Sequence, residues 1–339
     1  MHKPIWAFYF LTGGEKDSGS KKHTQGMGHA YRCMALIERI CSRSLAQCLV
    51  ITNKNNHVKN RLENSNIKII SPEKFFSQEK TDTIQLTFID VNYLEKEFIH
   101  SLPGKVICLA PRGEGKLYAD LSIRDTIEND VDGSFKNPPL SGPQYAVIHS
   151  DFLIERKKIL QGKPKEKNSI VVSMGGIDHF NMTGTVAKGL IGLSSKFSIK
   201  FMISSDYPHE KSLQNILDNT TAKSKVLKGE KKLSSHLANA ELGIFGCGLV
   251  CYEGLSVGTP SINLGHSEFH ALRGKELEQF GVSKYMGYYD NLAEGGLVNQ
   301  VKSYLLNRNL LKETSARCMD LVNGEGIDLI LNRTIELCL

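Results

Sequence analysis

The feature that most constrains the fold is a regular alternation of short apolar runs with longer amphipathic segments. The runs are rich in Ile, Val, Leu and Phe, which is typical of strands buried on both faces of a parallel sheet. They cover 5–11, 47–52, 67–70, 86–90, 106–109, 169–173, 199–203 and 242–245. Because helical patterns separate them, the sequence predicts βαβ units and two doubly wound, Rossmann-like α/β domains.

A polar segment, 161–168, marks the expected boundary between these domains, because it joins Gly and Pro to a run of charges. We therefore expect an N-terminal domain over 1–160 and a C-terminal domain over 168–339. Ligands bind beyond the carboxyl ends of the strands in such sheets, so the domains are expected to face each other across a cleft. The basic stretch 156–167 is interpreted as a solvated connection.

Composition argues against several classes of protein. A net charge of +6 is too small and too dispersed for a nucleic-acid surface, although it suits an anionic small ligand. No apolar run reaches the ~18 residues that a membrane span needs. The eight cysteines show no zinc-binding or redox spacing, which is typical of a reducing compartment and predicts a cytoplasmic protein. The sequence makes no prediction of an oligomeric state.

A glycine turn opens the helix expected after the first strand. Gly28 stands at the helix start, His29 lies in its first turn, and Arg32 lies near the same face. A helix start offers backbone N–H groups to an anion and disfavours a positively charged imidazole. His29 is therefore a candidate base, and Gly28 and Arg32 are candidate phosphate contacts. The alternative is a glycine turn followed by a histidine with only a local hydrogen bond.

A second glycine turn follows the strand expected at 169–173. Gly175 and Gly176 allow backbone N–H groups to approach a phosphate closely, and Asp178 precedes the next helical pattern. Asp178 is thus a candidate nucleotide contact. Capping of the helix is the simpler interpretation for Asp178 and for Asn181.

A third glycine turn, at Gly246 and Gly248, also follows an apolar strand and precedes a helix. The backbone of Leu249 and Val250 would then offer N–H groups to a phosphate, and Glu253 would lie near the helix start. A carboxylate there is a good acceptor for the two hydroxyl groups of a ribose. The alternative is a glutamate that interacts only with the helix dipole.

Other polar side chains give weaker signals. Asp90 ends an apolar strand, where its side chain would reach a bound ligand, and Tyr93 follows it closely. His266 and His270 have the i, i+4 spacing of a helical metal pair, but no third ligand has a convincing spacing. We therefore expect neither a metal nor another cofactor.

These segments, in this order, resemble the PseG/SpsG-like family, which is related to the MurG-type glycosyltransferases of the GT-B fold. The resemblance spans nearly the whole chain and rests on five ordered matches to family segments. They are the Gly-x-Gly-His-x-x-Arg-Cys signature at 26–33, Gly-Pro-x-Tyr-Ala at 142–146, Gly-Gly-x-Asp at 175–178, the glutamate and Gly-x-Pro at 253–260, and Val-Asp-Gly-x-Gly at 322–326, where this chain has Asn323 in place of Asp.

The resemblance implies the GT-B fold and hydrolysis of a UDP-activated diacetamido-trideoxy sugar, a step of pseudaminic acid biosynthesis. It implies that His29 is the catalytic histidine of a metal-independent reaction in which water displaces UDP. Glu253 in the C-terminal domain would hold the ribose. Asp90 and Tyr93 would act beside His29, and the expected substrate contacts are Tyr145, Phe269 and His270.

Three departures from the family pattern concern the ligand. Leu249 and Val250 stand where the family has hydroxyl side chains, Phe269 and His270 where it has an Asn-Gln pair, and 109–111 where it has an acidic pair. These changes suggest a different sugar and, to a lesser extent, a different nucleotide. Two alternatives to a hydrolase remain: a GT-B glycosyltransferase with a UDP-sugar donor, and a catalytically silent nucleotide-sugar-binding protein.

Overall fold

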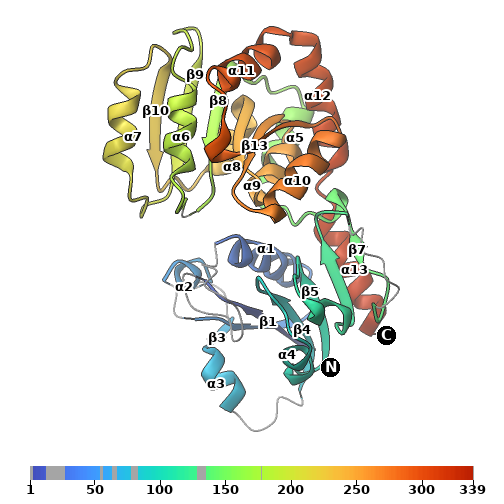
Figure 1. Cartoon of the computed structure of the whole chain (residues 1–339). Coiled ribbons are helices and arrows are strands. Elements are labelled where there is room, and N and C mark those ends of the chain that lie inside the picture. The colour runs from blue at the N-terminus through green and yellow to red at the C-terminus, as the bar shows by residue number, and fades with distance from the viewer. Residues whose placement is uncertain are drawn as a thin grey trace. The chain divides into compact units, whose positions relative to one another are not determined.

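A computed structural model describes residues 3–12, 27–53, 56–62, 67–77, 83–127, 135–176 and 178–338. The chain divides into two compact units, which are Met1–Val147 with Gly324–Leu339, and Ile148–Asn323. We call them the first and the second unit. Each is built around one parallel sheet with helices between its strands, as the apolar runs predict (Figure 1).

The first unit holds, within its described residues, a 7-stranded parallel sheet in the order β3-β2-β1-β4-β5-β6-β7. Its strands are β1 (Ile5–Phe10), β2 (Gln47–Ile51), β3 (Lys68–Ile70), β4 (Ile84–Asp90), β5 (Lys105–Leu109), β6 (Leu121–Arg124) and β7 (Leu140–Ser141). Its helices are α1 (Gly28–Ser42), α2 (Asn56–Leu62), α3 (Pro72–Ser77), α4 (Lys96–Ser101), η1 (Glu114–Leu117), η2 (Pro143–Tyr145) and α13 (Gly326–Cys338).

Strand β1 is buried on both faces. Trp6, Phe8 and Phe10 pack in one apolar cluster with α1 and α13, whereas Ala7 and Tyr9 pack in another with α3 and α4. Successive side chains of a strand point to opposite faces, so a strand covered on both sides needs apolar residues throughout. The sheet centre is therefore fixed, with β4 directly beside β1.

The second unit holds, in its described part, a 6-stranded parallel sheet in the order β10-β9-β8-β11-β12-β13. Its strands are β8 (Glu166–Ser173), β9 (Ser198–Ile203), β10 (Lys223–Lys228), β11 (Ala240–Gly246), β12 (Ser261–Gly265) and β13 (Ser283–Tyr288). Its helices are α5 (Ser150–Leu160), α6 (Met182–Gly189), α7 (Glu210–Leu217), α8 (Leu233–Asn239), α9 (Leu249–Ser256), α10 (Glu268–Gln279), η3 (Tyr289–Asn291), α11 (Gly296–Leu306) and α12 (Arg308–Leu321).

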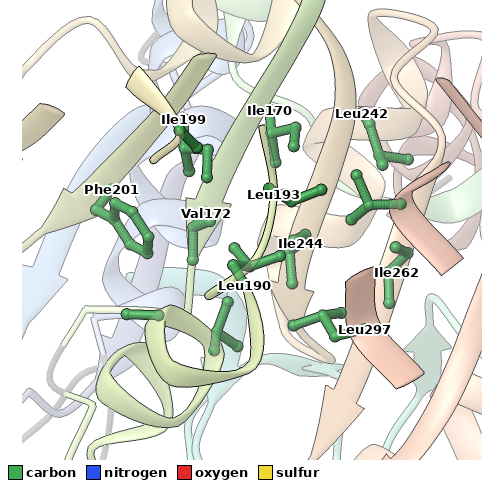
Figure 2. Close-up of a cluster of buried hydrophobic side chains, with 14 of the residues drawn as sticks. Ile170, Val172, Leu190, Leu193, Ile199, Phe201, Leu242, Ile244, Ile262 and Leu297 are labelled. Atoms are coloured by element: carbon green, nitrogen blue, oxygen red, sulfur yellow. The ribbon is translucent and has the colours of Figure 1, made fainter. Parts of the chain in front are cut away.

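The core of the second unit lies between its sheet and helices α6, α7 and α11. Alternate residues of the central strands supply it, because they point to the same face. Figure 2 shows these strand residues against side chains of the helical layer: Ile170, Val172, Ile199, Phe201, Leu242, Ile244 and Ile262 with Leu190, Leu193 and Leu297. Helices α6 and α7 contribute side chains to this cluster, and α9 and α10 contribute none.

The division between the units differs from the expected boundary at 161–168. Helix α5 and the segment after it belong to the second unit. The amine of Lys165 donates hydrogen bonds, at 2.8–3.0 Å, to the carbonyl groups of Ala238, Ala240 and Val257 and to the hydroxyl of Thr259. Burial lowers the pKa of Lys165 to about 7. The stretch interpreted as a solvated connection is therefore, at this residue, part of the folded unit.

The expected C-terminal domain is also interrupted, because α13 belongs to the first unit (Figure 1, red helix). Its residues Ile327, Ile330 and Leu331 are buried in the same cluster as Phe8. Gly326 lies so close to η2 that an added Cβ would come within 2.3 Å of a backbone oxygen there. The helix thus completes the core of the first unit, although it follows the second unit in the chain.

Candidate functional site

Both sheets have a switch point, which is a pair of neighbouring strands from which the chain continues in opposite directions. It lies between β1 and β4 in the first unit and between β8 and β11 in the second. Ligands of doubly wound sheets bind outside the carboxyl ends of the strands at this point. We call the residues that gather there the first-unit site and the second-unit site.

The first-unit site begins with a buried histidine–aspartate pair. Helix α1, the first helix described after β1, begins at Gly28, so His29 lies in its first turn. Asp90 is the last residue of the neighbouring strand β4. Nδ1 of His29 lies 2.6 Å from Oδ1 of Asp90, and the two residues are 9% and 0% exposed. Gly26, the first residue of the expected motif, lies outside the described residues.

Arg32 completes the pair. Its Nε donates to Oδ2 of Asp90 at 2.8 Å, and its Nη2 donates to Oδ1 at 2.8 Å. Burial favours a neutral Asp90, but the Arg32 guanidinium and then the His29 ring outweigh burial and hold the pKa of Asp90 below its usual value. Arg32, an expected phosphate contact, is therefore engaged by the carboxylate.

The hydrogen bonds determine the proton on one ring nitrogen of His29. Asp90 is a carboxylate and only accepts, so Nδ1 donates in its shorter contact, at 2.6 Å, while the Nη2 of Arg32, 3.2 Å from Nδ1, donates to the carboxylate at 2.8 Å. Nε2 is then the ring nitrogen that remains for proton transfer. It lies 3.1 Å from Oδ1 of Asn92, and that oxygen also accepts from Nη2 of Arg112 at 3.0 Å. The first-unit site is the network of His29, Arg32, Asp90, Asn92 and Arg112.

Sequence reasoning singled out neither Asn92 nor Arg112. Asn92 lies two residues beyond Asp90, and Arg112 follows the next strand, β5. Strand periodicity was the available signal, since alternate residues share a face. The expected Tyr93 is 47% exposed, and its ring lies beside Gly113. Tyr145 lies in η2, after the edge strand β7, and packs on the core of the first unit.

In the second-unit site, the turn after β8 holds Gly175 and Gly176, both exposed, with a positive φ of 96° at Gly175. The Asp178 carboxylate accepts from the N–H groups of Met182 and Thr183 at 2.8 and 2.9 Å. Together with the Asn181 cap of α6, Asp178 therefore satisfies the N–H groups at this helix start. Asp178 serves the helix, and the glycine backbone remains as the phosphate-binding candidate.

The turn after β11 leaves its helix start open. Gly246 packs so closely on the end of β8 that an added Cβ would lie 3.2 Å from a backbone oxygen. Helix α9 begins at Leu249 after Gly248, without a side-chain cap. Within the described residues, the N–H groups of Leu249 and Val250 have no hydrogen-bond partner. Two backbone donors at a helix start form a binding position for a phosphate.

Glu253 lies in the fifth position of α9, one turn further from the helix start than the sequence suggests. A helical side chain leans toward the N-terminus, so its carboxylate remains on the side of the turn. In the described part of the chain, this carboxylate has no hydrogen bond and no ion pair. Desolvation alone raises the pKa of Glu253 to about 7. A carboxylate left without donors is suited to hydroxyl groups of a ligand.

Aromatic rings extend the second-unit site beyond the turns. Phe180, 50% exposed, reaches from the loop after β8 to stack on His266, which follows β12, at 4.8 Å between ring centroids. The ring centroid of His266 lies 4.0 Å from that of His270, and the ring centroid of Phe180 lies 5.8 Å from that of Tyr289. Strand β11 lies between β8 and β12 in the sheet. The stacked rings of Phe180 and His266 therefore span the carboxyl end of β11, where the glycine turn at 246–248 begins.

The expected contact Phe269 lies beside this aromatic group, with its ring centroid 5.7 Å from that of His270. The guanidinium of Arg273 lies over its ring, 4.7 Å from the centroid. Nη1 of the same arginine donates to the carbonyl of Cys247 at 3.0 Å. Phe269 and Arg273 thus support the glycine turn after β11 from the first two turns of α10. The neighbouring His270 has its Nδ1 2.7 Å from the hydroxyl of Ser267.

Within the described residues, no group of three or more His, Cys, Asp and Glu side chains is placed to hold a metal ion. Nor is any helix in that part of the chain both long enough and apolar enough to cross a membrane.

Comparisons with known proteins give distant relatives. No model of a protein family matches the sequence. The uncharacterized protein MJ1062 of Methanocaldococcus jannaschii is 24% identical over 259 residues, which is 72% of this chain and 54% of that protein. The chain thus spans about half the length of this relative. The spore coat polysaccharide biosynthesis protein SpsG of Bacillus subtilis is 21% identical over 92% of this chain and 94% of its own length.

Solved structures identify the fold. The structure of TcCGT1 in complex with UDP aligns over 99% of both chains, with a TM-score of 0.69 and 13% sequence identity. The structures of MurG of Acinetobacter baumannii and of CalG4, the calicheamicin glycosyltransferase, align over 97% and 99% of this chain, with TM-scores of 0.67 and 0.60 and sequence identities of 14% and 12%. The protein therefore has the GT-B fold, with two Rossmann-like units, as the sequence predicts.

Proposed function

We propose that this protein hydrolyses a nucleotide-sugar and releases the free sugar and the nucleotide. The observation that carries the proposal is the buried pair of His29 and Asp90 at a sheet switch point, with Nδ1 bound to the carboxylate at 2.6 Å. This pairing leaves Nε2 to take a proton from water, which then attacks the anomeric carbon. Asp90 orients the ring and stabilises the positive charge that the ring gains.

The second-unit site is proposed to hold the nucleotide. Open N–H groups of Leu249 and Val250 and the exposed backbone of Gly175 and Gly176 suit a diphosphate. Glu253 would accept hydrogen bonds from the ribose hydroxyl groups. The UDP that occupies TcCGT1, a protein of the same fold, supports a uridine nucleotide here.

The sugar is proposed to be a deoxy or acetamido sugar of a surface glycan, as in pseudaminic acid biosynthesis. Two observations support this choice: the ordered motif resemblance to the PseG/SpsG-like family and the relative named for spore coat polysaccharide biosynthesis. Exposed Phe180 suits the apolar face that a deoxy sugar presents. This chain lacks the family's acidic pair at 109–111, and it has Phe269 and His270 in place of the family's Asn-Gln pair. These differences favour a sugar other than that of the family.

The test is incubation with UDP-, CMP-, GDP- and dTDP-sugars in water labelled with oxygen-18, followed by mass spectrometry. Hydrolysis at the anomeric carbon places the label in the free sugar and leaves the nucleotide unlabelled. Label in the nucleotide would contradict attack at carbon. A GT-B glycosyltransferase, which the solved structures of this fold favour as the second candidate, would release the nucleotide only in step with transfer of the sugar to an added acceptor.

A further inference from the structure

Asn92 lies on the Nε2 side of the His29 ring, and the Asp90 carboxylate lies on the Nδ1 side. Its Oδ1 lies 3.1 Å from Nε2, the nitrogen that remains for proton transfer. The loop that carries Asn92 is held to the next loop, because the Leu94 N–H donates to the Arg112 carbonyl at 2.8 Å. The ends of two neighbouring strands, β4 and β5, therefore set the position of this amide.

Arg112 determines which way round the Asn92 amide lies. Nη2 of Arg112 donates to the same Oδ1 at 3.0 Å, and a guanidinium has only donors. An amide turned round would set its NH2 group against guanidinium N–H groups, which is repulsive. The atom of Asn92 that faces His29 is therefore an acceptor.

The two protonation states of Nε2 then require different partners. With a proton on Nε2, the ring donates directly to Oδ1 of Asn92. Without that proton, Nε2 and Oδ1 are two acceptors that face each other at 3.1 Å. A molecule that donates to both relieves their repulsion, and water has two donor hydrogens in one small molecule.

We propose that Asn92 is a second group that binds the reacting water, with its acceptor direction set by Arg112; this rests on the proposed hydrolysis. Water enters as Nε2 and Oδ1 move apart, and it donates one hydrogen bond to each. Its oxygen then forms a bond to the anomeric carbon, and the bond from that carbon to the phosphate oxygen breaks, leaving the electron pair on the phosphate. One water proton passes to Nε2, and the other stays on the new sugar hydroxyl.

The test uses N92A, R112M and N92D, with R112M also made in the N92D background, and measures kcat and KM with a UDP-sugar and Kd for UDP. N92A should lower kcat about 10- to 100-fold without changing UDP affinity, because water loses one of its two acceptors. R112M should lower kcat about ten-fold, because the freed amide can turn its NH2 toward Nε2. In N92D the effect of R112M should shrink, since a carboxylate presents an acceptor either way round.

N137A is the matched control, since Asn137 donates to a backbone carbonyl of the same unit, that of Asp120, and N137A should leave kcat unchanged. Nitrogen-15 NMR should show that N92A changes the Nε2 signal of His29 while Nδ1 still carries its proton. The role of Asn92 is rejected if kcat of N92A lies within two-fold of wild type, or if R112M has the same effect in wild type and in N92D. Either outcome leaves the proposed hydrolysis standing. A wild-type protein that binds UDP but hydrolyses no nucleotide-sugar contradicts the proposed function and the water role with it.

Discussion

The two sheet switch points of this protein share a strand order and differ in chemistry. In the first unit, Asp90, His29 and Arg32 form a buried network in which each charged group has a partner. In the second unit, the helix start at Leu249 keeps its N–H groups open, and the Glu253 carboxylate has neither a hydrogen bond nor an ion pair among the described residues. One fold thus carries a buried network of paired charges at one switch point and, at the other, polar groups without partners among the described residues.

The largest effect should come from removing the proton-transfer group. We expect H29A to lower kcat by a factor on the order of 10² to 10⁴, as loss of a general base does, while UDP affinity barely changes. The measurement is steady-state turnover of a UDP-sugar together with calorimetric titration of UDP. H100A, at an exposed histidine of the same unit, is the control. Turnover of H29A within a few-fold of wild type would remove the first-unit site from the chemistry.

D90N should lower turnover less, by about 10- to 100-fold, because the ring stays in place but loses its carboxylate. The variant also leaves the Arg32 cation without its counter-charge, which costs about 3 kcal/mol of folding stability. The ion pair lowers the pKa of Asp90 in the folded protein. Its contribution to wild-type stability is therefore complete above the usual pKa range of aspartate, and it is lost as the pH falls through the pKa of folded Asp90.

Denaturant unfolding from pH 7 to pH 2 checks this for D90N. The stability difference between wild type and D90N should shrink below about pH 4. D120N, at a carboxylate that pairs with Lys136 in the same unit, should lower stability without lowering kcat. A D90N protein with wild-type turnover would mean that Asp90 only supports the fold.

E253Q tests the second-unit site and should weaken UDP binding about ten-fold, because two charge-assisted hydrogen bonds to a ribose become neutral ones. The raised pKa of Glu253, about 7, means that wild-type affinity should fall as pH drops below 7. E253Q should lack that part of the pH dependence. Calorimetry with UDP at pH 6 and pH 8 makes the comparison, with E268Q, at an exposed glutamate of α10, as the control.

E253Q should raise the stability of the protein at pH 8. It would lower stability if Glu253 only interacted with the helix dipole. The folded protein binds a proton at Glu253 between the ordinary glutamate pKa of 4.5 and about 7, so wild-type stability falls as pH rises through that window. E253Q should therefore raise the melting temperature at pH 8. An unchanged Kd for UDP with a lowered melting temperature would make Glu253 a structural residue.

A smaller effect is expected for F180A. Loss of the exposed ring should weaken binding of the intact nucleotide-sugar about two- to five-fold more than binding of UDP, because ring contacts contribute ~0.5–1.5 kcal/mol. Competition binding with UDP and a UDP-sugar measures the difference. F76A removes a similarly exposed ring from the first unit and is the control. Equal losses for the two ligands would assign Phe180 to the nucleotide.

Chelation should have no effect. The proposed reaction uses the His29 and Asp90 pair, and we expect EDTA-treated protein to keep its kcat. Loss of activity with EDTA and its return with a divalent ion would require a new interpretation of His266 and His270, whose rings lie 4.0 Å apart.

Most of the central strands could be predicted from the sequence, and so could the edge strand β3, which matches the run 67–70. Strands β6 and β12 and the edge strands β7, β10 and β13 were not predicted. Runs such as 5–11 and 199–203 correspond closely to β1 and β9, because strands buried on both faces are apolar throughout. Edge strand β10 (Lys223–Lys228) has lysine at three of its six positions and gives no apolar run. Edge strand β7 is only Leu140–Ser141, too short for a pattern.

The candidate site was predictable where one segment carries the signal. The glycine turn before His29 and the strand that ends at Asp90 each stand out in the sequence. Their contact with Asn92 and Arg112 depends on strand order, which no local pattern contains. The turn after β5 also requires Ala110 at a positive φ of 47°, an unusual conformation for alanine that propensities do not predict.

Helix α13 has a consequence for the order in which the protein folds during synthesis. A ribosome makes the first 147 residues, then the whole second unit, and only then the helix that fills the first core. The second unit is a continuous stretch and has all its core residues while the first still lacks Ile327, Ile330 and Leu331. We expect the second unit to become protease-resistant first on stalled nascent chains, which reverses the usual N-terminal-first order.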